Sequence, residues 1–253
     1  MNTRAYLRRI NYDGPTTPGL ETLRGLQRAH LFTVPFENLD IHLGRPINLD
    51  TQALFTKIVE NGRGGFCYEL NNLFAWLLGE LGFRVTRLAA RVLDAADEPG
   101  PEFDHLMLLV DLGDPLIADV GFGDASLYPL KLNDDEPQSD GRRAYRVTHQ
   151  DRKWYILQQA NDGGWKREIV FTLQPRAIEE FLATCHFHQT SPESPFTQRL
   201  VCSVATDAGR ITLRGQWDDM KVIITNDGVK RETFLSDRDA VIQLLQEAFK
   251  IVL

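Results

Sequence analysis

The sequence has no surplus of positive charge and no basic block. Its 253 residues include 28 Lys and Arg against 35 Asp and Glu, which gives a formal net charge of -7. Basic clusters such as Arg8-Arg9 and Arg142-Arg143 are only two residues long. Because proteins that bind a polyanion usually show a basic surplus or a basic block, we expect no nucleic acid partner. A small anionic ligand needs only one or two local cations and is compatible with this composition.

Cysteine is scarce, and long apolar runs are missing. Cys67, Cys185 and Cys202 are odd in number and widely spaced, which is not the pattern of a disulfide framework. The most apolar stretch, residues 73–78, is far shorter than the roughly 20 residues that span a bilayer, so we expect no membrane segment. Residues 1–10 carry three arginines and no apolar segment of the signal-peptide type. We therefore expect a cytoplasmic protein, in which thiols stay reduced and a thiolate is usable.

The first third of the chain has the periodicity of helices. The overall composition is ordinary for a globular protein, with 43% hydrophobic and 25% charged residues. Apolar residues recur at three- and four-residue spacing, which predicts helices over 17–34, from Asp50 as N-cap to Gly62, and over 67–81. Proline or glycine stands at or just beyond the end of each of them.

From residue 83 the period changes to that of strands. The β-rich segments predict a meander or small barrel, and they lie at 83–93, 106–112, 116–120, 143–148, 154–158 and 168–173. The remainder predicts a helix over 176–183, a hairpin over 199–206 and 210–214, and a final helix with Ser236 as N-cap. Helices, then strands, then a mixed tail indicate an α+β fold in three parts.

The most informative segment is residues 61–71, NGRGGFCYELN. A glycine-rich loop here delivers Cys67 to the first turn of an apolar helix. The unpaired N–H groups and the positive end of a helix favour an anion, and therefore a thiolate, at this position. Glycines in the loop permit close approach of a substrate carbonyl, and the backbone N–H of Cys67 is placed to stabilise an oxyanion. The alternative is that Cys67 is a small buried hydrophobe and that the glycines only cap the preceding helix.

Two further residues complete the set that a thiol nucleophile needs. Such a nucleophile requires a base, and the base requires a group that orients it. His105 stands at the start of an apolar strand, and Asp119 stands in the next one. Either could be an ordinary surface residue at a strand end, but antiparallel pairing of the two strands would bring them side by side. The order Cys, His, Asp fits the logic of other cysteine enzymes.

A metal site is the other reading that the sequence raises. Cys185, His186 and His188, with Cys202 beyond them, are residue types that bind zinc. Their spacing matches no usual structural zinc pattern, and His186 directly adjoins Cys185. We therefore expect no metal.

At residues 63–71, RGGFCYELN, the chain resembles the arylamine N-acetyltransferases. That family carries an Arg-Gly-Gly-x-Cys-x-x-x-Asn motif around its nucleophile. Further matches follow the family's order, namely Val34-Pro35-Phe36-Glu37-Asn38, Asp104-His105, Asp119-Val120-Gly121-Phe122-Gly123 and, more weakly, Ser194-Pro195-Phe196-Thr197. The stronger motifs cover the first half of the chain.

The resemblance implies a papain-like cysteine-enzyme core built from three parts. These are a helical bundle at 1–84 carrying the nucleophile, a β-barrel at 85–188 carrying the His and Asp of a triad, and an α/β lid at 189–253. It transfers Cys67, His105 and Asp119 onto the family's catalytic positions.

The resemblance also implies roles around the triad. Glu37 and Arg63 match positions that hold the catalytic loop by an ion pair. The residues that match positions near the acceptor pocket are Phe36, Phe122, Gly123 and Phe196. By residue type alone, core packing is the default for the phenylalanines.

The activity implied by the resemblance is acetyl transfer from acetyl-CoA to arylamines, arylhydrazines or arylhydroxylamines, by a ping-pong route through an acetyl-cysteine. Coenzyme A and a small aromatic acceptor would be the partners. The same motifs leave open an amide synthase that closes a macrolactam on a carrier-protein thioester, and a papain-like or transglutaminase-like cysteine hydrolase. A binding protein with an unreactive Cys67 is a further alternative.

Overall fold

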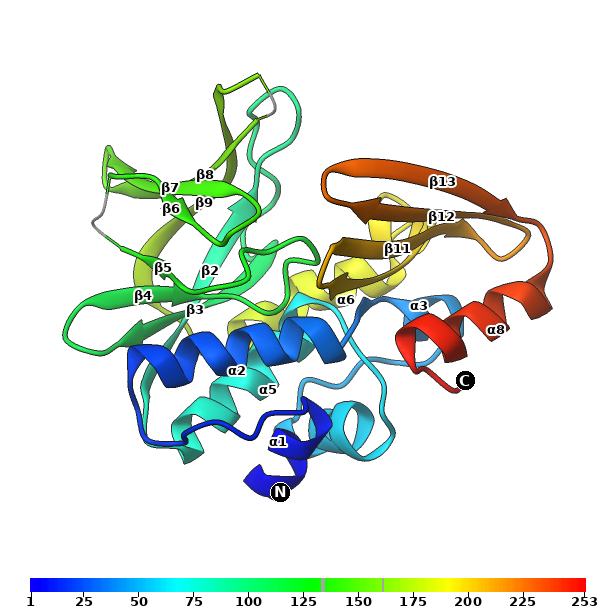
Figure 1. Cartoon of the computed structure of the whole chain (residues 1–253), viewed down its shortest axis with the longest axis horizontal. Coiled ribbons are helices and arrows are strands. Elements are labelled where there is room, and N and C mark those ends of the chain that lie inside the picture. Colours follow the sequence, from blue (N-terminus) through cyan, green and yellow to red (C-terminus); the bar gives the residue numbers. More distant parts are fainter. Residues whose placement is uncertain (133–134, 161) are drawn as a thin grey trace.

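The structure is a computed structural model that describes residues 1–132, 135–160 and 162–253. Helices, a barrel-like sheet, and a second sheet with its own helix follow one another along the chain (Figure 1). The predicted α+β class, with a papain-like core, a helical bundle, a β-barrel and an α/β lid, is confirmed. The boundaries at 84/85 and 188/189 stay a prediction. Within the described ranges, no helix combines the length and apolarity needed to cross a membrane.

The helical bundle is centred on one buried helix. Its elements are α1 (Thr3–Arg9), α2 (Leu20–Thr33), α3 (Leu39–His42), α4 (Thr51–Phe55), the π-helical turn η1 (Thr56–Glu60) and α5 (Cys67–Glu80). α5 is buried along most of its length, and α1, α4 and η1 pack around it. The predicted cap of the second helix is confirmed, because Oδ1 of Asp50 accepts the N–H of Ala53 at 3.0 Å. α1 was not predicted; it is short and fully buries only Tyr6.

Eight strands form one antiparallel sheet in the order β5-β4-β3-β2-β9-β8-β7-β6. They are β2 (Arg84–Val92), β3 (His105–Asp111), β4 (Pro115–Ala118), β5 (Leu130–Lys131), β6 (Gln138–Ser139), β7 (Ala144–Gln150), β8 (Lys153–Gln159) and β9 (Trp165–Pro175). The side chain of Gln138 joins the two ends of the sheet, since it accepts the N–H of Lys131 at 2.6 Å and donates to its carbonyl at 3.0 Å. The sheet therefore nearly closes, as the prediction of a small barrel required.

The lid is a second antiparallel sheet, in the order β1-β10-β11-β12-β13. Its strands are β1 (Phe36–Glu37), β10 (Leu200–Thr206), β11 (Gly209–Gln216), β12 (Asp219–Asn226) and β13 (Val229–Leu235). One face packs on α8 (Arg238–Phe249) through an apolar cluster that includes Leu213 and Leu245. β1 comes from the N-terminal part of the chain and pairs with β10, while Phe36 of β1 also bridges Gly65. The lid is therefore joined to the loop that precedes Cys67.

Two predicted helices begin elsewhere. The helix expected over 176–183 is a 3-10 turn, η2 (Ile178–Phe181), followed by α6 (Leu182–Thr190) and then α7 (Pro195–Gln198). The turn starts late because Glu180 accepts the N–H of Ala177 at 2.7 Å, and β9 continues to Pro175. The last helix is capped by Asp237 and not by Ser236, because Oδ1 of Asp237 accepts the N–H of Asp239 at 3.1 Å.

Candidate active site

The first turn of α5 holds Cys67 at the junction of the bundle and the barrel. Phe66 is the N-cap, and the Glu69 side chain accepts the Phe66 N–H at 3.1 Å, which ties the start of the helix to its own first turn. Cys67 is 3% exposed. N–H groups in a first helical turn have no acceptor within the helix, so they favour negative charge at this place.

Two glycines allow the nucleophile to sit this close to its surroundings. A Cβ at Gly121 would lie 2.7 Å from the Cα of Cys67. A Cβ at Gly64 would meet the carbonyl oxygen of Pro35. Both neighbours are backbone atoms that cannot swing away, so the loop before α5 and the loop after β4 require glycine at these positions.

His105 and Asp119 are adjacent, as the strand order predicted. β3 pairs antiparallel with β4, His105 opens β3, and Asp119 directly follows β4. Nε2 of His105 lies 2.6 Å from Oδ2 of Asp119, and both side chains are buried. The thiol of Cys67 interacts with the same ring and helps to raise its pKa. Because Nε2 is engaged by Asp119, Nδ1 is the nitrogen left for Cys67.

The charge on this imidazole is stabilised by the carboxylate. Burial acts to lower the pKa of His105, but the negative charge of Asp119 and the hydrogen bonds to Asp119 and Cys67 outweigh it and raise the pKa to about 10. A cation is thus favoured beside the sulfur, and a neighbouring cation favours the thiolate. The arrangement has the parts of a nucleophile, a base and an orienting carboxylate.

Asn71 belongs to the site, although the sequence motif alone assigned it no role. Its Nδ2 donates to Oδ1 of Asp119 at 2.8 Å and to the Leu106 carbonyl at 2.6 Å, and its Oδ1 accepts the Val120 N–H at 2.9 Å. It therefore ties α5 to both sides of the β3–β4 hairpin, which carries His105 and leads into Asp119. Its spacing from Cys67, four residues along one helix, is the signal that places both on one face.

Gln27 of α2 supports the same hairpin from the other side. Its Oε1 accepts the N–H of Asp119 at 3.3 Å, and its Nε2 donates to the carbonyl of Ser126 at 2.9 Å. The side chain is buried. Nothing in the sequence around Gln27 indicated this contact.

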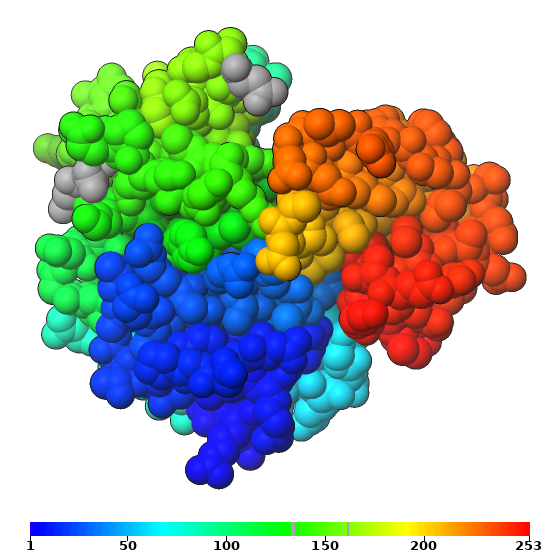
Figure 2. All heavy atoms as spheres, viewed as in Figure 1, coloured from blue at the N-terminus to red at the C-terminus, as the bar shows by residue number. Residues whose placement is uncertain are grey.

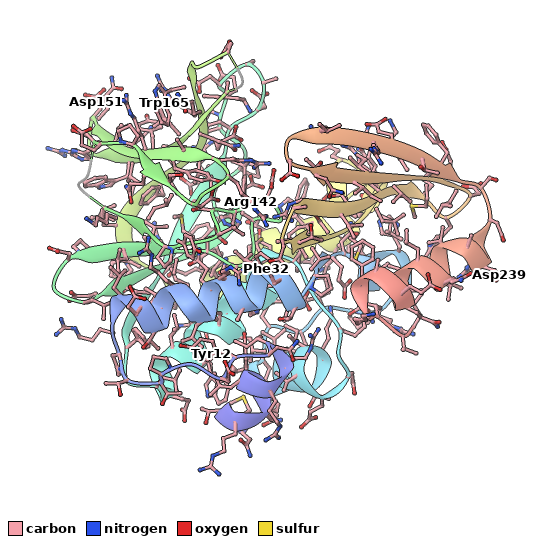
Figure 3. The ribbon with its side chains drawn as sticks, viewed as in Figure 1. Tyr12, Phe32, Arg142, Asp151, Trp165 and Asp239 are labelled. Atoms are coloured by element: carbon pink, nitrogen blue, oxygen red, sulfur yellow. The ribbon has the colours of Figure 1, made fainter. Side chains whose placement is uncertain are left out.

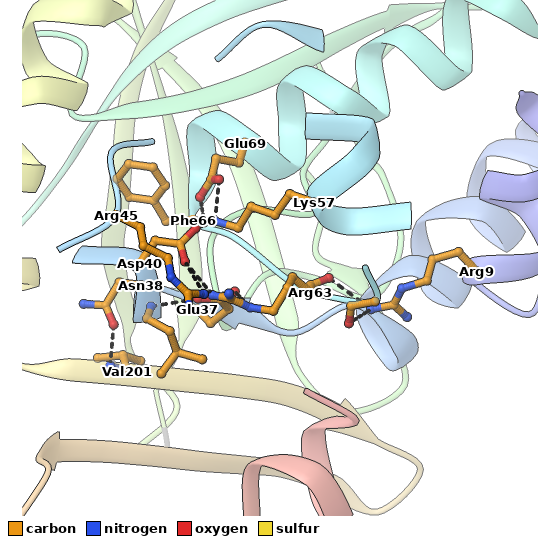
Figure 4. Close-up of polar contacts among 12 residues, drawn as sticks. Arg9, Glu37, Asn38, Asp40, Arg45, Lys57, Arg63, Phe66, Glu69 and Val201 are labelled. Carbon is orange, nitrogen blue, oxygen red and sulfur yellow. Dashed lines mark hydrogen bonds and ion pairs between the residues drawn. The ribbon is translucent and has the colours of Figure 1, made fainter. Parts of the chain in front are cut away.

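Glu37 and Arg63 form the ion pair expected from the resemblance. Oε1 of Glu37 accepts from Nε of Arg63 at 3.0 Å and from a terminal nitrogen at 2.8 Å, in a buried setting. The pair belongs to a larger network, because Asp40 contacts both Arg63 and Lys57, and Lys57 reaches Oε1 of Glu69 at 2.6 Å (Figure 4). The network runs from the β1 loop to the first turn of α5.

The network brings three carboxylates, those of Glu37, Asp40 and Glu69, together with Lys57, Arg63 and, at its edge, Arg45. Glu69, the acid on α5, is buried, which makes its carboxyl hard to ionise. Burial raises the pKa of Glu69 to about 6, although Lys57 acts in the opposite direction. The cations outweigh burial at Asp40 and lower the pKa of that carboxyl. The network joins β1, the loop before α5 and the first turn of α5.

Three of the four expected pocket residues line one cleft. Phe36, Phe122 and Gly123 lie in a cleft of about 860 Å³ between the barrel and the lid sheet. Figure 2 shows the barrel (green) and the lid (orange) facing each other across this groove. The Phe122 ring meets the His105 ring edge to face, with centroids 5.4 Å apart. Phe196 is not among the residues that line this cleft. Its ring packs on the ring of Phe36, with the two centroids 6.1 Å apart.

One side chain crosses the edge of the cleft. Arg142, from the barrel, donates to the carbonyls of Gly209 at 2.9 Å and Asp207 at 2.8 Å, in the turn between β10 and β11. Its guanidinium also lies over the ring of Phe32 of α2 (Figure 3). The barrel, the lid and the bundle meet at this residue.

Comparison with known proteins agrees with this geometry. The family model described as N-acetyltransferase matches residues 19–253. The chain is 39% identical over 238 residues to the arylamine N-acetyltransferase pineal gland isozyme NAT-3 of Gallus gallus, covering 85% of this chain and 81% of that protein. It is 37% identical over 259 residues to the arylamine N-acetyltransferase of Mycobacterium tuberculosis, covering 99% and 89%.

Solved structures give the same result. The arylamine N-acetyltransferase of M. tuberculosis superimposes with a TM-score of 0.91 at 36% identity, over 99% of this chain and 94% of that one. The enzyme of Mycobacterium marinum in complex with CoA does so with a TM-score of 0.89 at 32% identity, over 99% and 93%. The chain belongs to the arylamine N-acetyltransferase family.

Proposed function

We propose that this chain transfers an acetyl group from acetyl-CoA to the nitrogen of an arylamine, arylhydrazine or arylhydroxylamine, through an acetyl-cysteine at Cys67. The series Cys67–His105–Asp119 carries the proposal, because it brings a nucleophile, a base and an orienting carboxylate together in a buried setting. Membership in the family and a relative solved in complex with CoA support the donor.

In the first half-reaction, the Cys67 thiolate attacks the carbonyl carbon of the acetyl thioester. A carbon–sulfur bond forms to Cys67, and the bond to the sulfur of CoA breaks. His105, as an imidazolium, gives its proton to the departing CoA thiolate. The backbone N–H of Cys67, in the first turn of α5, supports the oxyanion that forms on the carbonyl oxygen.

In the second half-reaction, the acceptor nitrogen attacks the carbonyl carbon of acetyl-Cys67. Neutral His105 takes the proton from that nitrogen, and the bond to the Cys67 sulfur breaks to release the amide. The thiolate and imidazolium are regenerated together. One thioester replaces another in the first step, so the acetyl-enzyme forms with little change in free energy.

Water must be kept from the acetyl-enzyme, because its attack would turn the transferase into a hydrolase. The edge-to-face contact of Phe122 with His105 covers the base with an apolar ring. Gly123, with φ of +73°, turns the chain so that Phe36 approaches closely; a Cβ there would lie 3.4 Å from its ring. Phe122 therefore places apolar surface against His105, and Phe36 adds apolar surface to the cleft, where both rings would help to exclude water.

The test is the release of free CoA with and without an arylamine. We expect steady CoA release only when the amine is present, with one acetylated amine formed for each CoA. Steady release without amine would contradict a transferase and favour a thioester hydrolase. Cys67→Ala is the control. We expect it to lose both CoA release and formation of the acetylated amine, while its far-ultraviolet circular dichroism spectrum stays unchanged.

A further inference from the structure

The backbone is strained two residues before β3, the strand that begins with His105. Phe103 has φ of +60°, a left-handed conformation that is unfavourable for a bulky side chain. Its carbonyl accepts the hydroxyl of Tyr68 at 2.8 Å, and its ring packs edge to face on Phe181 at 5.2 Å. Strain of this kind persists only where the surroundings hold the backbone in place, and it is concentrated at functional sites.

Asp104, between this strained residue and His105, is held at three points. Its Oδ2 accepts the N–H of Val92 at 3.2 Å, and its Oδ1 lies 3.2 Å from Nε2 of His188. Its carbonyl oxygen accepts the hydroxyl of Tyr68 at 3.1 Å. The same carbonyl is 4.0 Å from the sulfur of Cys67. Any shift of Asp104 therefore moves both its successor His105 and an oxygen that faces the nucleophile.

His188, like Asp104, is held by several contacts. It is 2% exposed, and its Nδ1 lies 3.1 Å from Oγ of Ser194. The ring meets Phe196 edge to face at 5.2 Å and lies 6.2 Å from the ring of Tyr68. The series Ser194–His188–Asp104 resembles a serine triad, but Ser194 is fully buried and accepts the N–H of Phe196 at 3.2 Å. Its hydroxyl also donates to the carbonyl of His188 at 3.2 Å, so its hydrogen bonds hold the chain between α6 and α7.

We propose that the Asp104–His188 contact is a positioning clamp that holds the left-handed turn at Phe103 and thereby aims His105 at Cys67. This inference rests on the proposed function of Cys67 and His105. The clamp joins three parts of the chain: α6 supplies His188, β2 supplies the Val92 N–H, and the loop before β3 supplies Asp104. Because His188 also packs on Phe196, the clamp links the wall behind Phe36 to the catalytic strand.

The clamp acts through the positions of its groups, so the variants are chosen by which contacts they remove or keep. Asp104→Ala removes both side-chain contacts, and His188→Gln removes the ring that reaches Asp104. Asp104→Asn keeps the shape and the oxygen that accepts from Val92. A displacement of about 1 Å at a reacting group costs up to about 100-fold in rate, so we expect Asp104→Ala and His188→Gln to lose between about tenfold and about 100-fold. Asp104→Asn should stay within about threefold of the unchanged protein.

The measurement is the single-turnover rate constant for acetylation of Cys67 at saturating acetyl-CoA, read with the burst amplitude. A clamp that only stabilised the fold would reduce the amplitude, through loss of folded protein, and leave the rate constant of the remaining molecules unchanged. Matched controls are Asp111→Ala, at the other end of β3, and His149→Gln, on β7. Both should keep the unchanged protein's rate constant.

Alkylation of Cys67 by iodoacetamide provides a second readout that needs no acetyl-CoA. In Asp104→Ala and His188→Gln, we expect the rate of alkylation to fall by the same factor as the rate of acetylation. If the unchanged protein is alkylated quickly but never acetylated, the proposed function is contradicted and the clamp is not. Should Asp104→Ala not fold, His188→Gln carries the test. Rate constants within about twofold of the unchanged protein in Asp104→Ala and His188→Gln would overturn the clamp. An Asp104→Asn variant as slow as Asp104→Ala would do the same, since charge and not position would then be the cause.

Discussion

Replacing Asp119 by Asn keeps the shape of the side chain but changes which nitrogen of His105 carries a proton. In the native site, Oδ1 of Asp119 accepts from Asn71 and from the Gly121 N–H, both at 2.8 Å, and Oδ2 faces Nε2 of His105. An amide oxygen can keep the first two bonds, so the NH₂ group turns toward Nε2. His105 must then hold its proton on Nδ1, facing Cys67, where it cannot accept the thiol proton.

The size of the effect follows from the charge interaction. Burial opposes the imidazolium, yet the contacts with Asp119 and Cys67 raise the pKa of His105 from 6.5 to about 10. A difference of about 3.5 pKa units corresponds to roughly 5 kcal/mol, and it is the net effect that remains after burial has opposed the contacts with Asp119 and Cys67. Converted to rate, this net difference is about 10³- to 10⁴-fold. The equivalent change in a serine-protease triad costs about 10⁴. We expect kcat/KM for acetyl-CoA to fall by about 10³- to 10⁴-fold in Asp119→Asn.

The assay is stopped-flow detection of the CoA thiol in a single turnover, with excess enzyme. Asp114→Asn is the matched control, because Asp114 lies in the exposed turn of the same hairpin, between β3 and β4. Its rate should equal that of the unchanged protein. A rate for Asp119→Asn within about tenfold of the unchanged protein would refute the reasoning, since the tautomer of His105 would then not matter.

Three further variants test the packing around the site. Gly121→Ala should lower kcat by more than about tenfold, because its Cβ would sit 2.7 Å from the Cα of Cys67; a steady-state rate near normal would contradict this close approach. Arg63→Met should lower the free energy of unfolding in urea by about 3–5 kcal/mol, because it leaves the Glu37 carboxylate buried without its cation, and Glu37→Gln in the same chain should recover part of the loss. His30 is buried with its pKa lowered to about 3, while the unfolded chain takes up that proton near 6.5, so stability falls as the pH drops below 6.5. His30→Phe should therefore reduce the loss of unfolding free energy between pH 7.5 and pH 5 by about 2 kcal/mol, and an unchanged pH dependence would show that His30 is not the group responsible.

The bundle and the barrel were predictable because their periods are strong. Apolar positions on α5 recur at helical spacing and are buried, and the predicted strands differ from the observed ones by a few residues at their ends. The lid was predicted in part. β13 is exposed along almost its whole length, so it shows no alternation between apolar and polar residues. The better sequence signal for β13 was the pair Asp227-Gly228. Both residues have positive φ, which is typical of a tight turn such as the one that joins β12 and β13.

The triad was predictable because its chemistry needs few residue types. A cysteine after a glycine-rich loop, a His opening one strand and an Asp closing the next were enough to bring Cys67, His105 and Asp119 together as a hypothesis. Supporting residues were harder, because they act through the fold. Gln27 reaches the catalytic hairpin from a separate helix, and no local pattern marks it.

His188 shows the same limit of sequence reasoning. Its neighbours Cys185 and Cys202 raised the question of a metal, whereas the structure pairs it with Asp104, which is 84 residues away along the chain. The contact of α6 with the loop before β3 brings these two side chains together. Residues that orient a catalytic group from remote elements are therefore found by geometry and not by spacing.

The proposed reaction requires that the sulfur of Cys67 carry the acetyl group between donor and acceptor. Brief exposure to acetyl-CoA without an amine, followed by mass spectrometry of the intact protein and of its peptides, examines this directly. We expect one added acetyl group per chain, on the peptide that contains Cys67, and its complete loss when an arylamine is added. Acetylated arylamine formed by a protein that never carries the acetyl group, or that carries it on Cys185 or Cys202, would contradict the account.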